Sequence, residues 1–330
     1  MSNFESVVEQ AAIEWLQALG YDYLNGLVLA PDGSAPERKG WADTVLVGRL
    51  RAALGRINPS VPGDVLDDVA RRVLRAESPS LEERNLTFHR WLTRGVDVQV
   101  KRGGVLRGEQ AWLVDFVDPD KNDWLVVNQF TVIEGKYTRR PDVVVFLNGL
   151  PISVIELKNP EDTAATLKGA WNQLQTYKAQ IPGLFTTNEI LVVSDGVEAK
   201  VGSLTAGFER FGPWRTVDGE GLAPDSAPRL EVLLQGLFEK RRLLDYIRNF
   251  VLWETEDGFT KKLAGYHQYW AVTKAIHETV RASRPKGDKR IGVVWHTQGS
   301  GKSISMVYYT AKIIAEPEMF NPTIVVLTDR

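Results

Sequence analysis

The sequence predicts an α/β fold in which helices flank a mixed β-sheet. Two observations carry this prediction. Apolar residues recur at helical spacing between residues 3 and 19, and Gly20 follows where a C-terminal cap is expected. Short β-rich segments separated by turn residues come later, at residues 111–117, 124–132, 142–147 and 152–157.

The rest of the chain continues the alternation of helix and strand. A long helical pattern covers residues 163–180, an apolar strand covers 189–194, and residues 197–201 can pair with that strand. Further helices are expected at residues 42–54, 62–76, 230–250 and 266–281. The last part reads as one βαβ unit, with a strand at 291–295, a helix at 303–315 and a strand at 323–327.

The length of 330 residues predicts two domains. We expect the first domain over residues 1–205, a linker and connecting helix over 206–260, and a truncated second domain over 261–330. The linker contains residues 212–228, which are rich in Gly, Pro, Asp and Ser.

Composition excludes several classes of site. The chain has no cysteine, which rules out a disulfide scaffold, a cysteine-bound zinc site and a thiol nucleophile. The formal charge is -2, so any contact with nucleic acid must come from local basic patches. No segment has the roughly 18 consecutive apolar residues of a membrane helix. The N-terminus does not resemble a signal peptide, so we expect a cytoplasmic protein without a membrane partner.

The most informative segment is RPDVVVFLNGLPISVIELKNP at residues 140–160. Asn148-Gly149 marks a tight hairpin, and Glu156 and Lys158 point to the same face of its second strand. A plain two-residue loop would place Asp142 opposite Ile155. A three-residue loop, or a bulge near Pro151, would instead place Asp142 opposite Glu156, and we predict such a non-standard hairpin.

Two opposed carboxylates can share one hard cation such as Mg²⁺. We therefore expect Asp142 and Glu156 to be metal ligands. Such a site suits phosphodiester hydrolysis, because the metal neutralises a phosphate oxygen and lowers the pKa of a bound water. Lys158 would orient that water or help to deprotonate it. The alternative is that these are solvated charges at strand ends, which the apolar surroundings disfavour.

Pro141-Asp142 followed by Glu156-Leu157-Lys158 resembles the PD-(D/E)xK nuclease signature. The wider segment is similar to the nuclease domain of the restriction (motor) subunit of type I restriction–modification enzymes. This resemblance implies a restriction-endonuclease-like core with catalytic Asp142, Glu156 and Lys158. It also implies a Gln-x-x-x-Tyr motif on the next helix, which Gln173 and Tyr177 supply. An acid on the first helix is implied as well, for which we choose Glu9, with Glu5 and Glu14 as rivals.

A second candidate site lies at Gly299-Ser300-Gly301-Lys302-Ser303, between an expected strand and an expected helix. Glycines let backbone N–H groups curl around phosphate oxygens, and a helix N-terminus favours an anion. Lys302 would contact the β- and γ-phosphates of ATP, and the Ser303 hydroxyl would bind Mg²⁺.

This loop resembles that of superfamily 2 helicases, which implies the first part of a RecA-like P-loop lobe. Tyr266-His267-Gln268 resembles their adenine-reading element, so Gln268 is assigned to ATP. No acidic pair, second lobe or arginine finger follows the loop, although ATP hydrolysis needs them. We therefore expect the N-terminal part of a longer protein.

A basic group of Lys136, Arg139 and Arg140 directly precedes Asp142 and is our candidate for DNA contact. The resemblance implies an ATP-dependent type I site-specific deoxyribonuclease that cuts double-stranded DNA after ATP-driven translocation, with Mg²⁺ and ATP as cofactors. Its partners would be the methyltransferase and specificity subunits of the same system. Two alternatives are another nuclease–helicase fusion in DNA repair, and an inactive DNA- or nucleotide-binding module.

Overall fold

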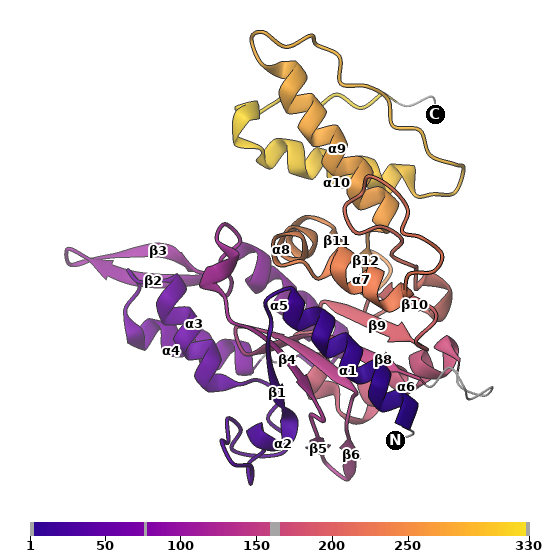
Figure 1. Ribbon diagram of the computed structural model, residues 1–330. Coiled ribbons are helices and arrows are strands. Elements are labelled where there is room, and N and C mark those ends of the chain that lie inside the picture. Colours follow the sequence, from indigo (N-terminus) through magenta and orange to yellow (C-terminus); the bar gives the residue numbers. More distant parts are fainter. Residues whose placement is uncertain (1–2, 76–77, 159–165, 328–330) are drawn as a thin grey trace.

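The computed structural model describes residues 3–75, 78–158 and 166–327, and its centre is a six-stranded sheet (Figure 1). β1 pairs with β4 and β8 pairs with β9 in parallel, and the other neighbouring pairs are antiparallel. The predicted mixed sheet flanked by helices is therefore confirmed. In spatial order the strands are β1 (Asp22–Asn25), β4 (Trp124–Asn128), β7 (Val143–Leu147), β8 (Leu150–Leu157), β9 (Ile190–Ser194) and β10 (Ala199–Gly202).

The two faces of the sheet carry separate apolar cores, because side chains alternate along each strand. Val143 and Val145 belong to the cluster that contains residues of helices α1 (Asn3–Ala18) and α7 (Arg229–Leu237). Val144 and Phe146 belong to the cluster that contains residues of α6 (Leu167–Gln180). Every residue of β7 and β8 is buried, as expected for central strands that are covered on both faces.

Smaller elements surround this sheet. A long hairpin extends away from the body of the molecule beside helices α3 and α4, and a short hairpin lies near the lower end of the sheet (Figure 1). These elements are α2 (Gly26–Leu29), α3 (Val47–Ile57), α4 (Gly63–Leu74), α5 (Leu81–Arg94), β2 (Val96–Arg102), β3 (Val105–Ala111), β5 (Val132–Glu134) and β6 (Tyr137–Arg139).

The strand expected at residues 111–117 is wrong, because β3 ends at Ala111. Asp115 explains the difference. Its Oδ1 accepts hydrogen bonds of 2.9 Å from the backbone N–H groups of Val117 and Asp118. Such local bonds offer the backbone an alternative to a strand ladder. The apolar side chains of Leu113 and Val114 are buried nonetheless, from a loop rather than from a strand.

The helix expected at residues 230–250 forms as two helices, α7 and α8 (Lys240–Asn249). Glu239 divides them, because its carboxylate accepts hydrogen bonds from the N–H groups of Arg241 and Arg242 and so caps a new helix. A hairpin that the sequence analysis did not predict, β11 (Val251–Glu254) and β12 (Thr260–Leu263), follows. The chain then enters α9 (Tyr266–Ser283) and α10 (Lys302–Ala315), which pack against each other (Figure 1).

The strands expected at residues 291–295 and 323–327 do not form, so the predicted βαβ unit is wrong for the described residues. Both segments are extended coil, and their apolar side chains are exposed, with Val293 at 93% and Leu327 at 91%. A strand needs a neighbour for its backbone N–H and C=O groups, and no strand lies beside either segment in the part of the chain that is described.

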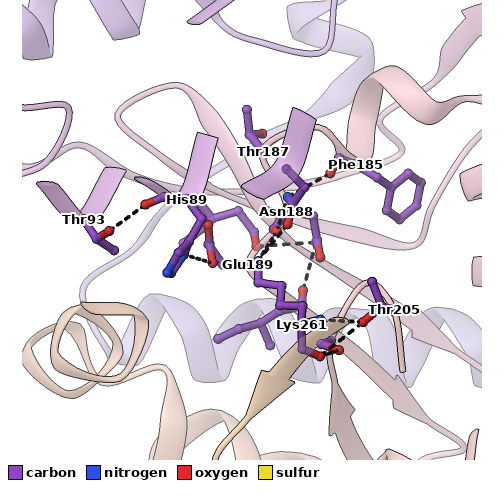
Figure 2. A network of polar contacts seen from close by, with 12 residues as sticks. His89, Thr93, Phe185, Thr187, Asn188, Glu189, Thr205 and Lys261 are labelled. Carbon is purple, nitrogen blue, oxygen red and sulfur yellow. Dashed lines mark hydrogen bonds and ion pairs between the residues drawn. The ribbon is translucent and has the colours of Figure 1, made fainter. Parts of the chain in front are cut away.

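A buried polar network connects the β11–β12 hairpin to the sheet (Figure 2). Lys261 of β12 places its Nζ 2.7 Å from Oε2 of Glu189, which directly precedes β9, and both side chains are fully buried. The same carboxylate oxygen lies 2.9 Å from Nδ1 of His89 on α5. Nζ of Lys261 also donates to Asn85 Oδ1 and to the carbonyl oxygen of Asn188.

The neighbouring charges of Lys261 and His89 decide the ionisation state of Glu189. Burial acts to raise the pKa of Glu189, but Lys261 and His89 outweigh burial and hold that pKa below its usual value. The carboxylate therefore stays ionised, and its contribution to stability is present above the pKa of an unfolded glutamate and is lost as the pH falls through the folded pKa.

We predict that Lys261→Met lowers the free energy of unfolding by about 3–5 kcal/mol, because it leaves Glu189 as a buried charge without its lysine partner. Lys262→Met is the matched control. Lys262 pairs with Glu254 at the surface, and such pairs contribute about 0–1 kcal/mol. Urea unfolding of both variants measures the difference. Equal, small losses would show that the buried pair does not anchor the hairpin.

Candidate active site

The turn between β7 and β8 is fixed by a buried asparagine. Asn148 and Gly149 have φ angles of 53° and 77°, the left-handed pair that a tight hairpin turn requires. The Asn148 side chain is fully buried: Oδ1 accepts from the N–H of Asp123 at 2.7 Å, and Nδ2 donates to the carbonyl of Leu113 and to Asn122 Oδ1, both at 2.9 Å. A Cβ on Gly149 would lie 2.4 Å from the Leu46 carbonyl oxygen, so the turn admits only glycine there.

A β-bulge follows the turn. Phe146 pairs with Pro151 and Val145 pairs with Ser153, so Ile152 is the extra residue of β8. The predicted bulge near Pro151 is therefore confirmed. Beyond it, Val143 pairs with Ile155, and the same register places Asp142 opposite Glu156. Alternation of side chains puts both carboxylates on the face of the sheet that α6 covers.

The structure brings Asp142, Glu156 and Lys158 together at this end of the hairpin. Oδ2 of Asp142 accepts a 2.7 Å hydrogen bond from the N–H of Leu157. Nζ of Lys158 lies 2.8 Å from Oε1 of Glu156. Glu156 is fully buried, whereas the Lys158 side chain keeps 18% of its surface exposed, so the ammonium group lies between the buried carboxylate and solvent.

Helix α6 supplies Gln173 and Tyr177, one turn apart. Gln173 Oε1 accepts from Lys158 Nζ at 2.7 Å, and its Nε2 donates to the Tyr177 hydroxyl at 2.5 Å. Burial raises the pKa of Tyr177, and the negative charge of Glu156 adds to this shift. The phenol is therefore neutral at any working pH, and it orients the Gln173 amide so that the amide oxygen faces Lys158.

The expected basic group lies on the rim of this site. Arg139 ends β6, and its Nε donates to Gln180 Oε1 on α6 at 2.5 Å. Lys136 lies in the preceding turn, with Nζ 5.4 Å from the centre of the Tyr137 ring. Arg140 is exposed, and it lines an open cavity of about 390 Å³ beside Gln173 and Tyr177.

Glu9 is buried on α1, and it does not form one group with Asp142 and Glu156. Its Oε1 accepts from Asn128 Nδ2 at 2.6 Å, and Asn128 pairs with Val143, next to Asp142. Of its rivals, Glu14 is exposed, and the side chain of Glu5 lies outside the described residues. The role of Glu9 stays a prediction. Asn128 itself was not predicted, although a polar residue that ends the apolar run WLVVN is a signal for it.

The described residues contain no group of three or more His, Cys, Asp and Glu side chains placed to hold a metal ion. The opposed pair of Asp142 and Glu156 nonetheless suits a hard cation, because carboxylate oxygens are its preferred donors. Both carboxylates are buried, and Lys158 pairs with Glu156, so a cation beside the two carboxylates would enter a site that already holds charged groups.

The glycine-rich loop is followed by the predicted helix, α10, but the strand predicted before it does not form. Gly299 and Gly301 have φ angles of 79° and 78°, which other residues rarely adopt. Lys302 begins α10, and its Nζ donates to the carbonyls of His296 and Thr297 in the same loop.

Gln268 contacts this loop directly. Its Nε2 donates to the carbonyl of Gly301 at 3.1 Å, and its Oε1 accepts from the N–H of Gly265 at 2.8 Å. The neighbouring His267 lies 3.1 Å from the Ser300 carbonyl oxygen. The structure thus brings Gln268 to the loop, while the hydroxyl-bearing Ser303 is exposed on the first turn of α10.

Two family models match parts of the chain. Residues 3–210, which contain the whole hairpin site, match the family model described as Type I restriction enzyme R protein N terminus. The chain belongs to this family. Residues 267–330, which contain the glycine-rich loop, match the SWI2/SNF2 ATPase model.

Curated relatives support the same family. The chain is 44% identical over 99% of its length to the type I restriction enzyme HindI endonuclease subunit of Haemophilus influenzae. It is 36% identical, again over 99% of its length, to the putative type I restriction enzyme MjaIXP endonuclease subunit of Methanocaldococcus jannaschii. The chain spans about a third of these relatives, 31% and 33% of their respective lengths. None of the described helices has the length and apolar character needed to cross a bilayer.

We predict that Asn148→Gly lowers the free energy of unfolding by about 2–4 kcal/mol, because it retains the backbone turn but leaves buried polar groups without their partner. Asn321→Gly is the control. Asn321 also has a positive φ, 62°, but is exposed, and its replacement should change stability by less than about 0.5 kcal/mol. Chemical denaturation compares the two. A loss below about 1 kcal/mol for Asn148→Gly would show that its hydrogen bonds do not hold the turn.

Proposed function

We propose that the chain carries the nuclease site of a type I restriction subunit, with a PD-(D/E)xK arrangement that cleaves double-stranded DNA. The observation that carries this proposal is the bulged hairpin, which places Asp142 opposite Glu156 with Lys158 bonded to Glu156. The match to the R protein family and the names of the relatives support it.

Asp142 and Glu156 would hold Mg²⁺ through their carboxylate oxygens. An Mg²⁺ ion held there would neutralise charge on a phosphate oxygen and lower the pKa of a water molecule. Lys158 then orients the attacking water and offsets the charge that develops on the phosphate. Gln173 positions Lys158 through its amide oxygen, and the neutral phenol of Tyr177 holds that amide in place. Lys136, Arg139 and Arg140 would attract the DNA backbone to the rim.

The glycine-rich loop is proposed as the ATP site of a P-loop motor that drives DNA translocation. Phosphate oxygens would replace the carbonyl groups of His296 and Thr297 as partners of Lys302. Ser303 would bind the Mg²⁺ of ATP, and Gln268 would read adenine beside the loop. The match to an ATPase model over residues 267–330 supports this assignment. DNA, a methyltransferase subunit and a specificity subunit are the proposed partners.

In the full-length subunit assembled with its partners, we predict that Glu156→Gln lowers DNA cleavage by about 100-fold or more, because a metal ligand is lost. ATP hydrolysis should persist, since the glycine-rich loop is intact. Lys302→Ala should abolish ATP hydrolysis and, with it, the cleavage that depends on translocation. Glu256→Gln, an exposed glutamate in the β11–β12 turn, is the control. Cleavage by Glu156→Gln at the rate of this control would refute the nuclease assignment.

A further inference from the structure

A cavity lined by Gln173 and Tyr177 adjoins the proposed nuclease site, since Gln173 contacts Lys158. Its volume is about 390 Å³, within the range of cavities that hold small ligands. One wall is the end of β6 with Arg139 and Arg140. The other wall is one face of α6, with Gly169, Asn172, Gln173, Thr176 and Tyr177. Gln173 contacts Lys158 directly, so a ligand in this cavity would lie one side chain away from the reacting centre.

The two arginines of this cavity differ in their contacts. Arg139 is committed to the protein, since its guanidinium bonds to Gln180 Oε1 and to the carbonyl of Thr138. Arg140 is exposed, and no hydrogen bond or ion pair links it to the residues that the structure describes. No carboxylate lines the cavity among those residues. An uncompensated guanidinium at a polar wall is suited to bind an oxyanion, most strongly a phosphate or a carboxylate.

Asn172 and Thr176 add neutral hydrogen-bonding groups one turn apart on α6. Both are exposed toward solvent and both line the cavity. The Asn172 amide can donate two hydrogen bonds. Thr176 donates its hydroxyl to the carbonyl of Asn172 at 3.1 Å, which fixes the direction of that side chain. Arg140 and the Asn172 amide therefore present hydrogen-bond donors to the cavity from two elements, while the Thr176 hydroxyl, whose hydrogen is already used, offers only an acceptor.

Gly169 is the least expected residue of the cavity. Glycine in a helix is unfavourable relative to alanine, and Gly169 has an ordinary helical backbone that any residue could adopt. Packing does not require it either. Among the residues that the structure describes, a Cβ there would meet Thr166 Oγ1 alone, at an ordinary contact distance of 3.6 Å. A side chain at this position would instead protrude into the cavity, so the glycine leaves room for a ligand.

We infer that this cavity is a second phosphate site, which holds a DNA backbone phosphate next to the one that is cleaved. Arg140 and the Asn172 amide bind its oxygens, and Gly169 allows the sugar–phosphate chain to lie close to α6. The backbone fits better than a base, because Tyr177, the one aromatic residue among the described lining residues, is buried. Such a contact holds DNA without reading its sequence. The inference rests on the proposed nuclease function and deepens it.

Binding of a short duplex of random sequence to the chain tests this inference, with affinity measured as a function of salt concentration. Arg140→Gln should weaken binding and lower the slope of log affinity against log salt by about 0.9, the contribution of one phosphate contact. Arg94→Gln, another exposed arginine but outside the cavity, should leave the slope unchanged.

Gly169→Ala and Gly169→Leu separate binding from folding. Each should keep or raise the midpoint of thermal unfolding, because each improves the helix, and yet weaken DNA binding, more so for leucine. Gly55→Leu is the control, since Gly55 is a helical glycine with open space around it and lies outside the cavity.

The second phosphate site would be overturned if Arg140→Gln and Gly169→Ala bound DNA with the same affinity and the same salt dependence as the unchanged chain. The nuclease proposal would survive that result if Glu156→Gln still lost cleavage. Weaker binding of inorganic phosphate by Arg140→Gln, with DNA binding unchanged, would show that the cavity accepts free phosphate and not the DNA backbone, and would also overturn the inference.

Discussion

The pairing register between β7 and β8 determines the geometry of the site. Ile152 is one residue more than the hairpin needs, and the bulge absorbs it. Without that bulge the partner of Asp142 would be Ile155, whose side chain faces the other core, and Glu156 would have no opposed carboxylate. A shift of one residue moves a whole strand's side chains to the other face, so the bulge decides which side chains meet α6.

Buried polar contacts then stabilise this register from both sides. Asn148 ties the turn to the loops that precede β4, and Gln173 holds Lys158 from α6. Farther away, Glu189, directly before β9, pairs with Lys261 of the β11–β12 hairpin (Figure 2). β9 pairs in parallel with β8, the strand that carries Glu156. The β11–β12 hairpin is therefore linked to the site through β9.

The features that depend on local sequence pattern could be predicted from the sequence. The strands around Asp142 and Glu156, the bulge near Pro151 and the one-turn spacing of Gln173 and Tyr177 are all local features. The start of α5 also has a local signal, since Ser80 caps the N–H of Glu83, but the sequence analysis did not use it. Lys261 has no local signal, because the hydrogen-bond and ion-pair partners of its ammonium group lie 72 or more residues away and only the tertiary fold brings them together. Residues 291–295 have the apolar pattern of a strand, but a strand also needs neighbours.

Cation binding by the chain is the most direct measurement of the central claim that the bulge creates a two-carboxylate metal site. Mn²⁺, a paramagnetic substitute for Mg²⁺, can be titrated by electron paramagnetic resonance. The account predicts one site, weakened about 10- to 100-fold or more by Asp142→Asn and equally by Glu156→Gln, but unaffected by Glu256→Gln. Unchanged Mn²⁺ affinity in both aspartate and glutamate variants would contradict it.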